Sequence, residues 1–165
     1  MNPLTISIAV VVVIAIIIGG VFAYQHFSSK SKQGKTVDAA IAASEAAYNK
    51  GDYNNALGLV TGMADKATSS AQKARVYQMQ AQAASGGGKL ADAVTYYNLK
   101  HKVDPSTIDA DAYVLGTIYQ RLGQKDQAIT QYKLAITYAN SHHNQYGSDA
   151  PAIQAAIDEL EGKTE

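Results

Sequence analysis

The sequence predicts an all-α protein with an N-terminal transmembrane helix, an α-solenoid of three helix-turn-helix repeats and a C-terminal capping helix. Residues 6–24 are almost wholly apolar, and through most of the remaining chain apolar or small residues recur at helical spacing. Ala56, Ala93 and Ala128 lie 37 and then 35 residues apart. This interval is close to the roughly 34-residue period of stacked helical hairpins. The spacing therefore predicts an array of paired helices.

The clearest repeat is predicted at residues 108–140. Its first half carries apolar or small residues on one helical face, namely Ala112, Leu115, Gly116, Tyr119 and Leu122. Beyond a break at Gly123-Gln124, the second half repeats this spacing with Ala128, Ile129, Tyr132, Ala135 and Ile136. The two halves predict antiparallel amphipathic helices joined by a tight turn. Because one helix pair cannot bury both apolar faces, neighbouring pairs are expected.

A second copy of this pattern is predicted at residues 71–107. The places of Gly123, Ala128, Tyr132 and Ala135 are taken here by Gly88, Ala93, Tyr97 and Lys100. The places of Ala112, Gly116 and Tyr119 are taken by Tyr77, Ala81 and Ala84. Small residues at these positions allow helix backbones to approach closely, so we expect them to have a structural role.

A fainter copy is predicted at residues 37–70. Its turn is expected at Gly51-Asp52-Tyr53, and Ala56 takes the close-packing position. Val60 and Met63 take the places that Tyr132 and Ala135 have in the clearest copy.

These residues resemble the tetratricopeptide repeat family. The clearest copy carries the family pattern with Leu115-Gly116, Tyr119, Ala128, Tyr132 and Ala135, and Asp104-Pro105 matches the family's closing Asp-Pro. The chain departs from the pattern at Ala40 and Ala112, where an aromatic is expected, and at Ala43-Ser44, which lacks a large residue. The resemblance covers about two thirds of the chain. It implies a solenoid whose concave surface binds segments of other proteins.

Residues 1–27 are predicted to be a transmembrane helix. Residues 6–24 would form roughly 29 Å of helix, which matches a bilayer core of about 30 Å. A cleaved secretory signal is the alternative, because Val21-Phe22-Ala23 resembles a cleavage site. Against it, the usual basic leader is missing and the apolar run is longer than that of a typical signal peptide.

Residues 28–36 are polar, contain Gly34 and show no apolar periodicity, so they predict a short linker. Lys30, Lys32 and Lys35 follow the apolar segment, whereas no basic side chain precedes it. The positive-inside bias would keep these lysines, and with them the repeats, on the cytoplasmic side of the membrane.

Residues 141–165 are predicted to form a polar loop and a capping helix. Ser148 or Asp149 can cap this helix, and Pro151 suits its first turn. One face carries Ile153, Ala156, Ile157 and Leu160. The opposite side is polar, as the exposed end of a repeat stack requires.

Composition bounds the function further. The 14 basic and 14 acidic side chains all lie beyond residue 29 and balance to no net charge, which argues against a nucleic-acid partner. The sequence has no cysteine and therefore no disulfide or thiolate chemistry. We expect no cofactor, no metal site and no enzymatic activity.

Two motifs superficially suggest chemistry. Gly86-Gly87-Gly88-Lys89 resembles a phosphate-binding loop, but Leu90 follows the lysine, the first glycine is missing at the required distance and no strand precedes it. It predicts a turn within a repeat. His142-His143, with Asp149 nearby, has no third metal ligand at fixed spacing and predicts an exposed loop.

The family resemblance places the groove lining on the first helix of each repeat, just off the packing stripe. Carried onto this sequence, it implies a protein-binding groove formed by Tyr48, Asn49, Arg75, Gln78, Gln82, Tyr113, Thr117, Gln120 and Arg121. Such amides, hydroxyls and aromatics suit an extended peptide. A solvated helix face of the same composition is the alternative reading.

The sequence favours a membrane-tethered scaffold that binds a partner protein segment and recruits it to the bilayer that residues 6–24 would span. The alternative is a structural subunit of a secretion, pilus or envelope assembly that acts through self-association or its membrane helix. Binding of chaperone tails is disfavoured. The family's two-carboxylate clamp is missing, since its positions hold Ile41, Glu45, Gln78 and Gln82.

Overall fold

A computed structural model describes residue 25 and residues 28–141 and 150–163. Residues 28–49 are helical. They are followed by α2 (Tyr53–Val60), α3 (Ser70–Gly86), α4 (Leu90–Val103), η1 (Pro105–Thr107), α5 (Ile108–Arg121), α6 (Lys125–Ser141) and α7 (Ala150–Glu161). Over the described ranges the chain contains helices and no strand, so the predicted all-α class is confirmed there.

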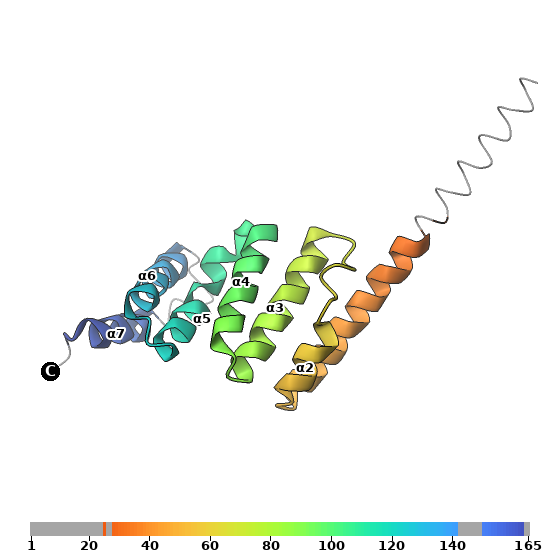
Figure 1. The fold of residues 1–165 in the computed structure, drawn as a ribbon. Helices are drawn as coiled ribbons and strands as arrows, with labels where there is room; N and C mark the ends of the chain where they lie inside the picture. The colour runs from red at the N-terminus through yellow and green to blue at the C-terminus, as the bar shows by residue number, and fades with distance from the viewer. Residues whose placement is uncertain (1–24, 26–27, 142–149, 164–165) are drawn as a thin grey trace, which may run out of the picture.

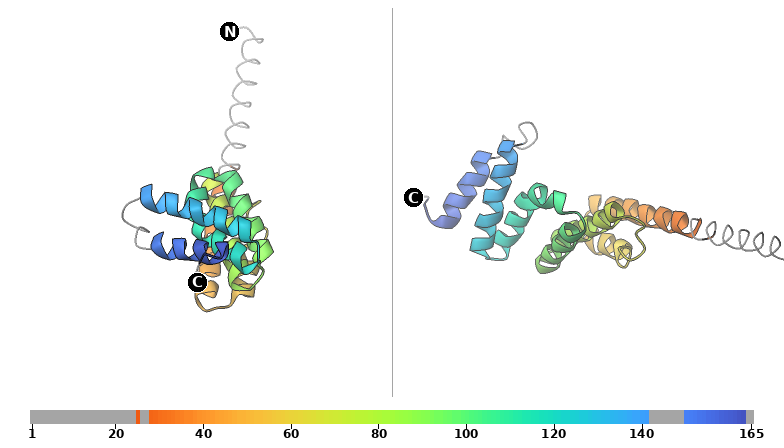
Figure 2. Two further views of the ribbon diagram at one scale, coloured as in Figure 1. Left: turned by 90° about the vertical axis from the view of Figure 1, so that its left-hand side faces the viewer. Right: turned by 90° about the horizontal axis from the view of Figure 1, so that it is seen from above.

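The helices follow one another in a single row in chain order (Figure 1). They pack as successive pairs, residues 28–49 with α2, α3 with α4, and α5 with α6, while α7 packs against α6. Seen from above, α6 and α7 are turned relative to α3 and α4, so the helix axes rotate along the row (Figure 2). This arrangement is that of stacked helical hairpins.

The same turn joins the two helices of each pair. Gly51, Gly88 and Gly123 have φ of 77°, 76° and 70°, which is the left-handed region that glycine adopts without strain. The residue after each glycine donates its backbone N–H to a carbonyl of the last helical turn, at 3.0 Å for Asp52, 2.8 Å for Lys89 and 2.9 Å for Gln124. These bonds end the helix and reverse the chain, as the repeat pattern predicts.

Small buried residues set how closely the paired helices approach. Ala56, Ala93 and Ala128 are each 0% exposed. Gly116, Ala81 and Ser44 occupy equivalent positions and are also buried. A Cβ added at Gly116 would lie 2.5 Å from the Tyr132 ring, so this position requires glycine for the ring to pack where it does.

The first pair differs from the prediction in two ways. Residues 28–36 are helical instead of a linker, and the Gly34 carbonyl accepts a hydrogen bond from Gln72 Nε2 of α3 at 2.9 Å, which connects the segment to the second pair. The second helix ends at Val60, within the predicted repeat 37–70. Gly62 has φ of 72° and Gln80 Nε2 donates to the Val60 carbonyl at 3.2 Å, so the chain leaves the helix there.

The remaining predictions concern segments near the two ends of the chain. The predicted transmembrane segment 6–24 and the loop with His142, His143 and Asp149 lie outside the described residues. Among the helices that the structure does describe, none has the length and hydropathy needed to cross a bilayer. At the carboxyl end, Ile153 and Ile157 of α7 are 4% and 1% exposed and pack with Tyr132 and Ala135 of α6.

Candidate functional site

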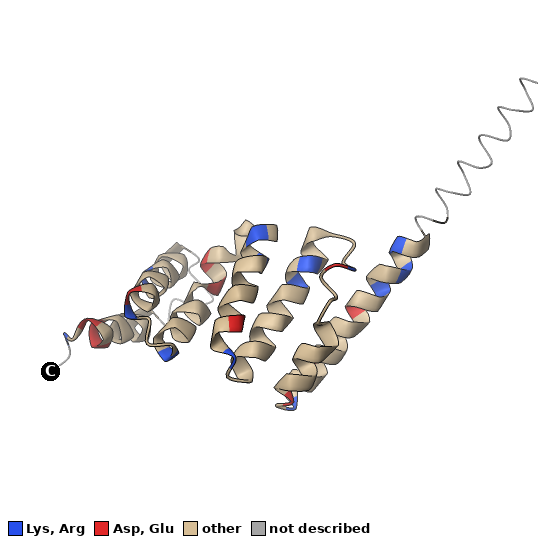
Figure 3. Ribbon diagram, viewed as in Figure 1, with Lys and Arg blue, Asp and Glu red and all other residues tan. Residues whose placement is uncertain are grey.

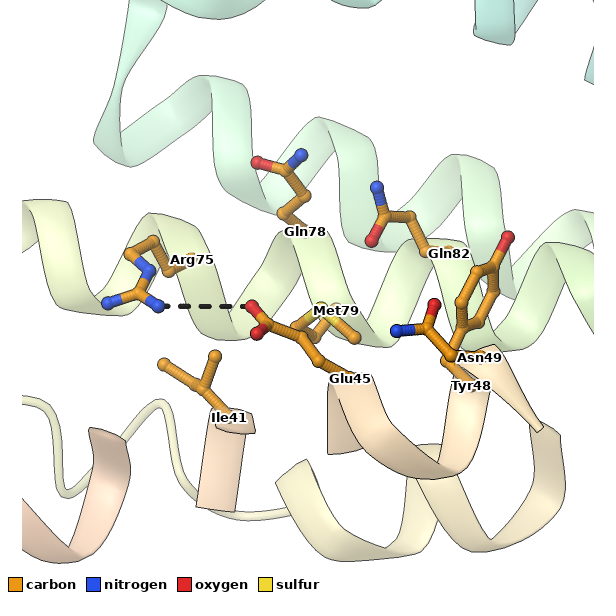
Figure 4. Close-up of a pocket in the computed structure, with 8 residues that line it drawn as sticks. All are labelled: Ile41, Glu45, Tyr48, Asn49, Arg75, Gln78, Met79 and Gln82. Atoms are coloured by element: carbon orange, nitrogen blue, oxygen red, sulfur yellow. Dashed lines mark ion pairs between the residues drawn. The ribbon is translucent and has the colours of Figure 1, made fainter. Parts of the chain in front are cut away.

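A groove of about 460 Å³ lies between the helix of residues 28–49 and α3 (Figure 4). It is lined by Ile41, Glu45, Tyr48, Asn49, Arg75, Gln78, Met79 and Gln82. The lining residues recur every three or four positions on each helix, so each helix turns one face toward the groove. The groove therefore follows from the periodicity of the two helices.

The bottom of the groove is apolar and its walls are polar. Ile41 is 0% exposed and Met79 is 5% exposed, and both belong to the apolar cluster that joins the first two helix pairs. Asn49, Gln78 and Gln82 rise from the two helices as primary amides. Within the described part of the chain, these three amides have no side-chain hydrogen-bond partner. They are free to bond to a ligand.

Charge in the groove centres on Arg75. Its Nη1 lies 3.6 Å from Asp38 Oδ1 and its Nη2 lies 3.9 Å from Glu45 Oε1. The Arg75 and Glu45 side chains reach toward each other across the groove (Figure 4). All three side chains are at least half exposed, and such ion pairs contribute only about 0–1 kcal/mol. A carboxylate of a partner can therefore replace Asp38 or Glu45 beside Arg75 at little cost in free energy.

Tyr48 is held at one end of the groove by an edge-to-face contact. Its ring centroid lies 5.3 Å from that of Tyr53, and the two rings are inclined by 64°. This geometry suits the quadrupoles of the two rings. Tyr48 thus offers an aromatic face next to the free amides.

The predicted groove residues divide between two places. Tyr48, Asn49, Arg75, Gln78 and Gln82 line the groove described above. Tyr113 lines a separate cavity of about 110 Å³, together with Asp109, Ala110, Val114, Ala135, Tyr138 and Ile153. Gln120 instead holds the Tyr132 hydroxyl, which donates to Gln120 Oε1 at 2.6 Å, and Thr117 Oγ1 lies 3.5 Å from that hydroxyl. Arg121 is exposed at the end of α5.

The sequence reasoning missed several lining residues. Met79 lines the groove, although it belongs to the buried core. Val114, beside Tyr113, gives two consecutive large apolar residues next to the packing stripe of Ala112 and Leu115. Both residues cannot face the core of one helix pair. This departure from strict amphipathic spacing was the signal in the sequence that could have indicated an apolar surface outside the core.

Comparison with known proteins bears on the α5–α6 pair. The sequence of residues 112–142 matches the tetratricopeptide repeat family. This stretch is a tetratricopeptide repeat. No curated protein matches the chain.

The matched tetratricopeptide repeat shares its construction with the two earlier helix pairs. All three use a turn glycine with positive φ, a buried alanine five residues later, and a small buried residue on the facing helix. The described fold is therefore consistent with a series of such repeats. A tetratricopeptide repeat suggests protein–protein binding.

Proposed function

We propose that this protein binds an extended segment of a partner protein in the groove between residues 28–49 and α3, and recruits that partner to a membrane. The observation that carries the proposal is the set of free amides, Asn49, Gln78 and Gln82, above an apolar floor. A main chain in extended form presents N–H and C=O groups in alternation, and an amide side chain can satisfy both. No catalytic step is assigned to the chain.

The groove also offers contacts to partner side chains. Ile41 and Met79 close its floor with buried apolar side chains, and Tyr48 provides a rigid aromatic face. Arg75 can exchange Asp38 or Glu45 for a carboxylate of the partner. Aromatic and arginine side chains are common energetic centres of protein interfaces. The combination supports an interface of modest size that a single segment can fill.

The membrane part of the proposal is supported by the sequence of residues 6–24, which lie outside the described residues. An apolar segment of this length suits a bilayer span. The repeats would then remain close to the membrane surface, on the side where Lys30, Lys32 and Lys35 follow the apolar segment. Protease access to the repeats in sealed vesicles would test on which side of the membrane they lie.

Photo-crosslinking in intact cells tests the groove directly. A photoreactive residue placed at Gln78 or Gln82 should capture a defined partner, whereas one placed at the exposed Thr95 of α4 should not. Replacing Gln82 with Trp should fill the groove and abolish capture from position 78. The matched control Thr95→Trp should leave capture unchanged. Equal capture from positions 78 and 95, or capture that survives Gln82→Trp, would refute the groove as the binding site.

A further inference from the structure

The helix α5 carries an exposed apolar surface. Among the described residues, the large hydrophobic side chains that remain exposed are Ile108 at 38%, Tyr113 at 53% and Val114 at 39%. All three belong to α5, and Tyr113 and Val114 line the 110 Å³ cavity between α5, α6 and α7. The other walls are Ala135 and Tyr138 of α6 and Ile153 of α7. The cavity is thus a mostly apolar pit that opens beside exposed apolar side chains.

The cavity and the groove are lined by equivalent positions of successive repeats. Ala110, Tyr113 and Val114 lie 35 residues after Arg75, Gln78 and Met79, so they occupy the same places on α5 that the groove wall occupies on α3. The interval equals the spacing of the turn glycines Gly88 and Gly123. The cavity therefore uses, one helix pair further along, the positions that form the α3 wall of the groove, and the lining changes from polar to apolar between them.

Size and charge restrict what the cavity can hold. Its volume is below the roughly 150 Å³ of an apolar cavity that takes up benzene, so it suits one branched aliphatic side chain better than an aromatic ring. Asp109 lies at its rim, is exposed, and has no hydrogen-bond or ion-pair partner among the described residues. Figure 3 shows acidic residues at the beginning of α5, where Asp109 lies in the first turn. A cationic group next to the aliphatic side chain would complement that charge.

We infer that the cavity between α5, α6 and α7 anchors a leucine-sized aliphatic side chain of the partner, flanked by a lysine or arginine that pairs with Asp109. This inference rests on the proposed function, because it assigns the second anchor of the same partner segment. The groove then binds main chain and polar side chains near residues 28–49, while the cavity fixes the register of the segment through one apolar residue. Sequence preference would come chiefly from the cavity.

Methyl NMR of the full-length chain in lipid nanodiscs can test the anchor without a natural partner. The probes are ten-residue Gly-Ser peptides that carry Lys-Leu-Lys, Glu-Leu-Glu or Lys-Ala-Lys at the centre. The Lys-Leu-Lys peptide should shift the methyl signals of Ile153 and Val114 in a saturable way, and Lys-Ala-Lys should not. It should bind about threefold more tightly than Glu-Leu-Glu, as expected for one exposed ion pair. Asp109→Asn should bring that ratio close to one.

Variants separate the cavity from the groove. Ala110 is exposed and lines the cavity, so Ala110→Leu should fill it and abolish the methyl shifts, while Ala91→Leu on the exposed face of α4 should leave them intact. Gln82→Trp should not affect the peptide shifts. No shift with any peptide, or equal binding of all three, would overturn the anchor even if crosslinking from Gln78 succeeds. Shifts of the same methyls that depend on protein concentration alone would also overturn it, because a second copy would then be the occupant.

Discussion

The two junctions between successive helix pairs both contain apolar clusters, but they differ in chemistry at two equivalent positions. Between the first and second pairs, Met63 and Val76 belong to an apolar cluster with Val37, Ile41 and Met79. Lys100 lies 37 residues after Met63, and Asp111 lies 35 residues after Val76. These two residues form a buried ion pair between α4 and α5, with Lys100 Nζ 2.7 Å and 3.0 Å from the two carboxylate oxygens.

A third group completes the ionic junction. His101 Nε2 lies 2.9 Å from Asp111 Oδ2, so the same carboxylate oxygen contacts both a lysine and an imidazole. Lys100 and Asp111 are 4% and 8% exposed. The difference between the junctions shows that the repeat fixes where the helices meet, whereas local side chains decide what holds them. An apolar junction weakens gradually when trimmed, but a buried ion pair depends on both of its members.

Breaking the ion pair should produce the largest effect. Asp111→Ala leaves the Lys100 ammonium buried without its partner, and we expect a loss of about 3–5 kcal/mol in the free energy of unfolding. Urea denaturation followed by circular dichroism measures this loss. At the apolar junction, the equivalent change Val76→Ala removes only apolar contact and should cost about 2 kcal/mol.

The double variant Lys100→Met with Asp111→Val converts the ionic junction into the apolar kind. It should recover part of the loss, because removing both ions also removes their desolvation cost, while His101 Nε2 still loses its partner. A double variant as unstable as Asp111→Ala would mean that the ion pair supplies a geometry that apolar residues cannot reproduce at this junction.

The second largest effect should be the loss of folding stability at alkaline pH, which concerns the junction that contains Asp111. Burial, together with the negative charge of Asp111, raises the pKa of Tyr97 well above its usual value of 10.0. A pKa raised in the folded state gives stability that is complete below the unfolded value and is lost as pH rises toward the folded one. By pH 11 this residue should therefore have cost the wild type on the order of 1 kcal/mol relative to pH 8.

Tyr97→Phe should remove that part of the pH dependence. Denaturation curves of the wild type and the variant at pH 8, 10 and 11 provide the comparison, and the difference between them should grow with pH. Tyr132 holds the equivalent position in the next pair, where its hydroxyl bonds to Gln120, so Tyr132→Phe is the matched control. Parallel curves for Tyr97→Phe and the wild type would contradict the assignment.

The sequence predicts the helix pairs well because their determinants are local. Gly51, Gly88 and Gly123 terminate helices through their own backbone conformation, and the spaced alanines mark the close contacts whatever surrounds them. The segment 28–36 is the exception. Its composition predicts a linker, but it is helical and is contacted by Gln72, which is 38 residues away from Gly34 in the chain.

The site residues were predictable only where the repeat register alone decides which way a side chain faces. Gln78 and Gln82 follow from the helical face of α3, and both lie at the groove between that helix and residues 28–49. Thr117 is the equivalent of Gln82, yet it lies 3.5 Å from the Tyr132 hydroxyl within its own helix pair and does not line the groove. Likewise the pattern places Lys100 at the position of Ala135, but only the packing of α4 against α5 brings Asp111 to it.

The smallest effect is expected at the junction of α6 and α7, where the ion pairs are exposed. Lys163 and Lys133 both contact Glu161, and the hydrogen bond from Lys163 is the main cause of its lowered pKa. A lowered carboxyl pKa gives stability that is present above the usual value and is lost as pH falls through the folded one. Because solvent screens these charges, Glu161→Gln should leave the melting midpoint at neutral pH nearly unchanged in a thermal scan. A loss comparable to that of Asp111→Ala would mean that charge, and not the burial of Ile153 and Ile157, holds α7 in place.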